Sequence, residues 1–123
     1  GCDGIDEVTL SGPTCVCEIR NGELSSYEIT PEQFGLKRCE LKDLLGGDPE
    51  QNAQITKDIL SGKEKGPKRE VVVINAAVAM YLGIDGVSIA DCIKKAEEIL
   101  DSKKAYEKME AFVRATNFFG EKK

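Results

Sequence analysis

The chain has 123 residues, 41% of them hydrophobic, which fits one domain with a single core and argues against two independent domains. Its 22 acidic and 17 basic residues give a formal net charge of -5, so no broad positive field exists to neutralise a nucleic-acid backbone, and nucleic acid is not expected as a partner. The chain has no histidine, which excludes a histidine general base, a Ser-His or Cys-His nucleophile and most zinc sites.

The apolar stretch over residues 71–82, interrupted by Asn75, is far shorter than the ~20 residues that span a bilayer, so no membrane segment is expected. A start at Gly1, without methionine or a signal peptide, predicts a piece of a longer protein. The five cysteines show no metal-ligand spacing such as C-x-x-C and are interpreted as reduced thiols of a cytoplasmic protein: Cys2, Cys15, Cys17, Cys39 and Cys92.

Residues 8–29 are predicted to form an antiparallel β-ribbon. In the first half, Cys15, Cys17 and Ile19 fall on one face of a strand, and the polar residues Thr14, Glu18 and Arg20 fall on the other. Asn21-Gly22 then supplies the pair of residues that adopt positive φ in a tight hairpin. Cys15 and Cys17 share one face of the strand, and we interpret them as small buried hydrophobic residues rather than as a redox pair.

Capping sequences begin the helical segments that follow the ribbon. Thr30-Pro31-Glu32-Gln33 predicts a single helical turn, and residues 39–45 predict a short helix or a loop. Asp48-Pro49-Glu50-Gln51 predicts a longer helix that ends at Gly62. The basic residues between 63 and 69 are interpreted as a solvated connection, because Gly66-Pro67 argues against a continuous helix through them.

Three further helices are predicted in the C-terminal half. Residues 70–82 are locally ambiguous, since 71–74 favour a strand and 75–82 favour a helix, but their combined length indicates a buried helix. Residues 88–100 predict an amphipathic helix that begins at Ser88. Ser102 is expected to cap a last helix whose apolar stripe has core spacing: Ala105, Tyr106, Met109, Phe112 and Val113.

The resulting order, an N-terminal antiparallel β-ribbon followed by about four helices, defines an α+β chain. A two-stranded ribbon is marginally stable alone, and an almost wholly apolar helix needs cover on every side. The helices supply part of that cover. The remainder is expected from protein N-terminal to Gly1.

An adjacent carboxylate pair, Asp6-Glu7, lies between Gly4 and the apolar residues that start at Val8. Two carboxylates suit Mg²⁺, a hard cation that takes one or two carboxylates together with water and phosphate oxygens. Such a site needs phosphate-binding partners, which residues 1–5 do not offer. On composition alone, the favoured interpretation is a solvated turn before a strand.

Five segments together resemble the C-terminal part of the anthranilate phosphoribosyltransferases, a family of nucleoside phosphorylase-like phosphoribosyltransferases. Each segment alone is common in unrelated proteins, but five in the family's order are specific. They are Gly4-Ile5-Asp6-Glu7-Val8-Thr9-Leu10, Gly12-Pro13-Thr14, Tyr27-Glu28-Ile29-Thr30-Pro31-Glu32-Gln33-Phe34-Gly35-Leu36, Gly46-Gly47-Asp48-Pro49-Glu50-Gln51-Asn52-Ala53 and Asn75-Ala76-Ala77.

The resemblance implies that residues 1–123 are the C-terminal part of a single α/β catalytic domain. It implies that a helical domain, through which the intact enzyme dimerises, and a phosphate-binding half precede Gly1. The implied reaction transfers the 5-phosphoribosyl group of 5-phosphoribosyl 1-diphosphate (PRPP) to the amine of anthranilate, in tryptophan biosynthesis. By the same resemblance, Asp6 and Glu7 bind Mg²⁺ on the diphosphate, this segment carries no catalytic residue, and the chain alone is inactive.

Alternatives stay open for the substrate that accepts the phosphoribosyl group and for the function of the chain itself. A pyrimidine nucleoside phosphorylase-like or other phosphoribosyltransferase activity is one, and a non-catalytic interaction module with this fold is another. Asn75 and Gly46-Gly47 match family motifs but are expected to have structural roles. For Asn75 the expected role is a hydrogen bond from its amide to backbone, where a loop meets the helix.

Overall fold

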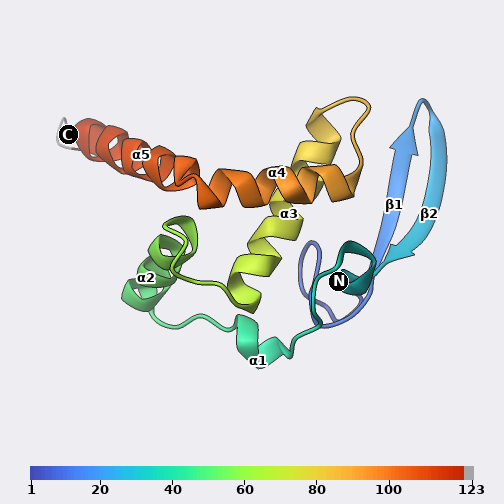
Figure 1. The fold of residues 1–123 in the computed structure, drawn as a ribbon, viewed down its shortest axis with the longest axis horizontal. Coiled ribbons are helices and arrows are strands. Elements are labelled where there is room, and N and C mark those ends of the chain that lie inside the picture. Colours follow the sequence, from blue (N-terminus) through green and yellow to red (C-terminus); the bar gives the residue numbers. More distant parts are fainter. Residues whose placement is uncertain (121–123) are drawn as a thin grey trace.

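The computed structural model describes residues 1–120, with side chains through residue 118. In this range a two-stranded antiparallel sheet precedes the helices, which confirms the predicted α+β class (Figure 1). The helix α3 is central, α4 crosses it, and the ribbon and α2 lie on opposite sides (Figure 1). In chain order the elements are β1 (Thr14–Arg20), β2 (Glu23–Ile29), the 3-10 helix η1 (Pro31–Phe34), α1 (Leu41–Leu44), α2 (Pro49–Leu60), α3 (Pro67–Gly83), α4 (Ile89–Asp101) and α5 (Lys104–Gly120).

The hairpin forms at the predicted Asn21-Gly22 turn. The two strands pair from Thr14 opposite Ile29 to Arg20 opposite Glu23. Asn21 and Gly22 have φ angles of 53° and 83°, as a tight hairpin turn requires. The paired strand begins at Thr14 rather than at residue 8, because the backbone of residues 8–10 bonds to the side chains of Asn75 and Thr14 and to the loop at Cys39 instead of to a neighbouring strand.

The inward face of β1 is the opposite of the predicted one. Cys15 and Cys17 are exposed, so their interpretation as buried hydrophobic residues is wrong. The inward face carries Thr14, which is buried, and Glu18, whose carboxylate accepts a hydrogen bond from the Tyr81 hydroxyl of α3 at 2.8 Å. This contact sets the phase of the strand, since a shift of one residue would turn every side chain to the other face.

The segments between the ribbon and α3 follow the predicted caps. The Gln51 N–H donates to the Asp48 carboxylate at 2.8 Å at the start of α2, and Gly62, with a φ of 78°, follows its end. Gly47 donates its N–H to Asn52 Oδ1 at 2.8 Å and accepts from Asn52 Nδ2 at 2.9 Å. These contacts fit the structural role expected for the Gly46-Gly47 turn.

The ambiguous residues 71–74 belong to α3, which confirms the helix. It begins at Pro67, before the predicted residue 70, because proline at the first helical position has no N–H to leave unpaired. The interpretation of Arg69 as part of a solvated connection is therefore wrong. Its side chain is only 10% exposed and pairs with Asp101 of α4 at 3.0 Å, which links the first turn of α3 to the end of α4.

The boundary between α4 and α5 differs from the prediction at one residue. α4 begins as predicted, with the Asp91 N–H donating to Ser88 Oγ at 3.1 Å. Ser102, however, ends α4, where its N–H donates to the Glu98 carbonyl at 2.9 Å, so the expected N-cap role is wrong. Lys103, with a φ of 61°, then turns the chain into α5.

The last helix, α5, projects away from the body of the chain (Figure 1). Its predicted core stripe reaches the core only at Ala105, whereas Tyr106 and Met109 are half-buried and Phe112 is 68% exposed. The reason is that α5 continues away from the crossing of α3 and α4, where the core lies (Figure 1). Neither α5 nor any other helix in residues 1–120 combines the length and the apolar character needed to cross a membrane.

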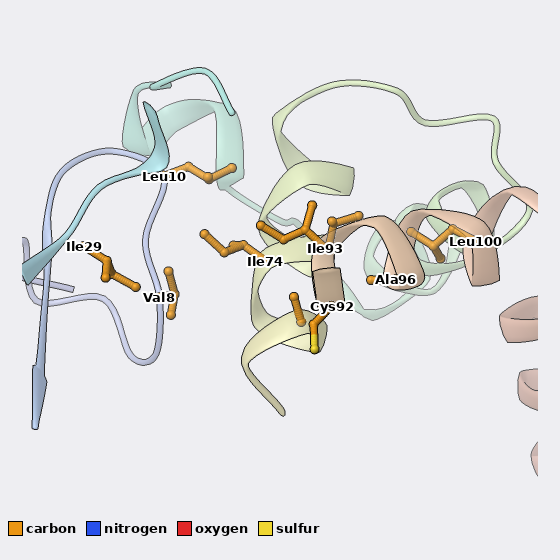
Figure 2. Packing of buried hydrophobic residues seen from close by; sticks show 10 residues of the cluster. Val8, Leu10, Ile29, Ile74, Cys92, Ile93, Ala96 and Leu100 are labelled. Carbon is orange, nitrogen blue, oxygen red and sulfur yellow. The ribbon is translucent and has the colours of Figure 1, made fainter. Parts of the chain in front are cut away.

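The core lies between the N-terminal loop, α3 and α4 (Figure 2). α4 contributes the buried face that its periodicity predicts, and α3 contributes a narrower stripe. Together with Ile29 of β2, the loop residues that follow the acidic pair complete this cluster, whose members are Val8, Leu10, Ile29, Val73, Ile74, Ala77, Cys92, Ile93, Ala96 and Leu100. The acidic pair thus lies at the edge of the core.

The side chain of Asn75 fastens the N-terminal loop to α3. Its Oδ1 accepts from the Val8 N–H at 3.0 Å, and its Nδ2 donates to the Val8 carbonyl at 2.9 Å. Nδ2 also donates to the Val71 carbonyl at 2.9 Å. The amide therefore gives Val8 both bonds that a neighbouring strand would give, which confirms the predicted structural role.

Replacing Asn75 by alanine is expected to lower the free energy of unfolding by about 1–3 kcal/mol, because both polar groups of Val8 lose their partner. Urea denaturation followed by circular dichroism measures the change. Asn117→Ala, at an exposed position of α5, is the matched control and should change stability by less than about 0.5 kcal/mol. Equal losses of unfolding free energy in the two variants would contradict the stabilising role of the hydrogen bonds between Asn75 and Val8.

Candidate functional site

The acidic pair lies in a loop formed by residues 1–13, whose backbone reverses twice. Gly4 has a φ of 89°, and Glu7 has a φ of 65°. The left-handed conformation costs a residue with a side chain roughly 1–2 kcal/mol. Strained positions of this kind gather at ligand-binding sites, so the turn at Glu7 supports a functional interpretation of the pair.

A network around Asp3 closes the loop. One carboxylate oxygen accepts from the Thr9 hydroxyl at 2.6 Å and from the Ser11 hydroxyl, and the other accepts from the Ile5 N–H at 3.0 Å. These hydrogen bonds, chiefly those from Ser11 and Thr9, hold the pKa of Asp3 at about 2, below its ordinary value of 3.8. Asp3 is therefore ionised near neutral pH and acts as the acceptor around which the loop folds.

The two carboxylates of the candidate site are open to solvent. Asp6 and Glu7 are both exposed, whereas Val8, next in the chain, is buried and held by Asn75. Two exposed carboxylates fit Mg²⁺, which keeps several waters and takes the rest of its ligands from phosphates. Among residues 1–120, no third carboxylate or thiol group gathers with this pair. Its metal role stays a prediction.

The fold and the loop define the class of protein. Residues 1–106 match the model described as "Glycosyl transferase family, a/b domain", and the chain belongs to this family. It is 50% identical over 117 residues to the anthranilate phosphoribosyltransferase of Methanobrevibacter smithii and 48% identical over 117 residues to that of Endomicrobium trichonymphae. Each match covers 95% of this chain, so the similarity predicted from the motifs is confirmed.

Solved structures agree with the sequence relatives. The anthranilate phosphoribosyltransferase of Saccharomyces cerevisiae in complex with 4-fluoroanthranilate matches 95% of this chain with a TM-score of 0.85 and 32% identity. The enzyme from Thermus thermophilus matches 91% of it with a TM-score of 0.82 and 38% identity. This chain covers 34% and 33% of those structures, and it likewise spans about a third of the length of the curated relatives.

Sequence reasoning missed Asp3, the residue that organises the loop. Its partners, Thr9 and Ser11, lie six and eight positions away, and no helix or strand periodicity connects them. An aspartate before glycine is a turn signal, and two hydroxyl residues close by could have indicated an acceptor network. The closure itself depends on the two backbone reversals, at Gly4 and Glu7, which sequence alone did not place.

The lowered pKa of Asp3 makes the stability of the loop depend on pH. A carboxylate whose pKa is lowered in the folded state stabilises that state above its ordinary pKa. The contribution is lost as the pH falls from 3.8 to about 2, where Asp3 becomes protonated. The thermal midpoint should therefore fall more steeply over this window in the wild-type chain than in Asp3→Asn. Asp85→Asn, at another exposed aspartate, should retain the wild-type slope, and parallel curves for all three would contradict the assignment.

Proposed function

We propose that this chain is the C-terminal third of an anthranilate phosphoribosyltransferase. In this proposal it supplies Asp6 and Glu7 to a magnesium–diphosphate site. The observation that carries the proposal is the similarity to enzymes of that name over 95% of the chain, in a segment that includes the acidic loop. The exposed carboxylates and the left-handed turn at Glu7 add support.

The rest of the enzyme is proposed to precede Gly1, as a helical domain followed by the phosphate-binding half of the catalytic domain. Support comes from the apolar side chains left exposed: Ile19, Leu24, Leu45, Leu82 and Phe112 are each at least 66% exposed. Apolar surface of this extent usually marks contact with other protein. The intact enzyme is proposed to be a cytoplasmic homodimer whose subunits meet through the helical domain.

The proposed reaction forms a bond from the amine nitrogen of anthranilate to C1 of the ribose as the bond from C1 to the diphosphate oxygen breaks. The amine is the nucleophile, so neither a protein nucleophile nor a histidine is needed. Mg²⁺, when bound, would offset charge on the departing diphosphate. Asp6 and Glu7 would hold that cation, while the Asn75 clamp and the Asp3 network keep their loop in place before substrate arrives.

Anthranilate is the proposed acceptor because the similar enzymes carry its name and the yeast enzyme is seen with 4-fluoroanthranilate. The yeast enzyme is also seen in complex with PRPP and Mg, which supports the donor and the cation.

A hybrid enzyme tests the role of the acidic pair. It joins residues 1–123 to the preceding two thirds of the Methanobrevibacter smithii relative, which is 50% identical over the shared segment. Loss of anthranilate fluorescence with PRPP reports turnover. Asp6→Ala and Glu7→Ala should each lower turnover at limiting Mg²⁺ by at least about tenfold, a loss of ~1.4 kcal/mol of transition-state stabilisation. Glu110→Ala, at an exposed position of α5, is the control and should keep full turnover.

Near-normal turnover of both acidic variants at limiting Mg²⁺ would contradict the metal assignment. A hybrid that folds and binds PRPP but leaves anthranilate unchanged would instead contradict the acceptor. Turnover with a pyrimidine nucleoside and phosphate would then favour the phosphorylase alternative.

The chain by itself is expected to leave anthranilate unchanged, because it lacks the proposed phosphate-binding half. The same fluorescence assay with PRPP and Mg²⁺ checks this, with the hybrid as positive control. A steady Mg²⁺-dependent loss of signal from the chain alone would show that residues 1–123 suffice for the reaction.

A further inference from the structure

Two thiols and a carboxylate gather on the surface next to the N-terminal loop. The sulfur atoms of Cys2 and Cys15 lie 2.8 Å apart. Glu28 places a carboxylate oxygen so that all three atoms lie within 4.8 Å of one another, and all three residues are exposed. In the described part of the chain this is the one group of three or more such side chains close enough to hold a metal ion.

The fold brings these side chains together from three separate segments. The Cys2 N–H donates to the Pro13 carbonyl at 2.9 Å, which holds the start of the loop beside the start of β1. Cys15 and Glu28 are opposite one another in the register of β1 and β2. Directly opposed residues on paired strands project their side chains to the same face, so the strand register delivers the carboxylate to the thiol.

We propose that Cys2, Cys15 and Glu28 form a binding site for a thiophilic divalent cation such as Zn²⁺. On binding, both thiols release their protons to solvent, and two thiolates and one carboxylate become ligands, with water in the remaining position. Thiolates select soft and borderline cations, and a carboxylate is an accepted third ligand. Mg²⁺, which requires oxygen ligands, does not suit this site.

The geometry needs little adjustment to accept the ion. Sulfurs about 2.3 Å from a tetrahedral zinc lie about 3.8 Å apart, so the pair has to open by roughly 1 Å. Both side chains are exposed and can rotate apart. The hydrogen bond between the thiols and their mutual repulsion when ionised raise the pKa of Cys15, which a bound cation would reverse.

The site differs in chemistry and position from the acidic pair, so it stands independently of the function proposed above. A cation there would tie Cys2 to both strands of the ribbon and close the loop that carries Asp6 and Glu7. A cation that binds the folded state but not the unfolded state would stabilise the fold.

Co²⁺ titration tests the site, because thiolate ligation gives an intense near-ultraviolet charge-transfer band. The reduced chain, kept in a phosphine reductant, should develop this band, and Zn²⁺ should displace it. Cys2→Ser and Cys15→Ser should each lose most of the band, and Glu28→Gln should weaken binding. Cys17→Ser is the matched control, since Cys17 is an exposed thiol on the same strand and outside the cluster. It should leave the band unchanged.

The same titration in denaturing urea separates the folded site from binding by loose cysteines, and the proposal requires the band to be lost there. A band that survives Cys2→Ser and Cys15→Ser, or that persists in urea, would overturn the proposal. So would a reduced folded chain that shows no thiolate band. A mass lower by two hydrogens under air, with no band after reduction, would identify the pair as a disulfide-forming pair instead.

Discussion

The two hydrogen bonds between the Asn75 side chain and the Val8 backbone decide where the acidic loop lies. Val8, Thr9 and Leu10 are buried, yet they have no neighbouring strand within the described chain, so their backbone must find partners elsewhere. Asn75 offers an acceptor and a donor at one end of one side chain, and α3 holds that side chain in place. Because Val8 is fixed, the preceding Glu7 and Asp6 stay at the edge of the core.

The loop that precedes Val8 is held by a second set of contacts, the hydrogen-bond network of Asp3. Asp3 accepts hydrogen bonds from residues on either side of the acidic pair, and the resulting network is strongest while the carboxylate is ionised. Within the described part of the chain, the carboxylates of Asp6 and Glu7 make no hydrogen bond or ion pair with other protein groups. The acidic pair therefore lies in a turn that is anchored on both sides. This arrangement is expected of a preorganised cation site, because the loop need not become ordered when the ion binds.

The candidate thiol site extends the same picture to the ribbon. The ribbon packs against α3 through Glu18 and Tyr81, and that contact turns Cys15 outward. Had the predicted phase been right, Cys15 would be buried and unable to meet Cys2. The hydrogen bond between Glu18 and Tyr81 therefore makes Cys15, which the sequence pattern placed in the core, an exposed candidate metal ligand. The two candidate cation sites then differ in hardness: a carboxylate pair lies within the N-terminal loop, and a thiol pair lies where the two ends of that loop meet.

Local chemistry in the sequence determined the hairpin at Asn21-Gly22 and the caps at Asp48 and Ser88, because positive φ and unpaired helix N–H groups are properties of a few neighbouring residues. The occurrence of five different motifs in the family's order indicated the family. Only the tertiary structure decided the phase of β1, the burial of Arg69 against Asp101 and the exposure of α5, since each depends on which surface lies opposite. The same holds for the meeting of Cys2, Cys15 and Glu28, which depends on strand register and on a loop that closes across eleven residues of chain.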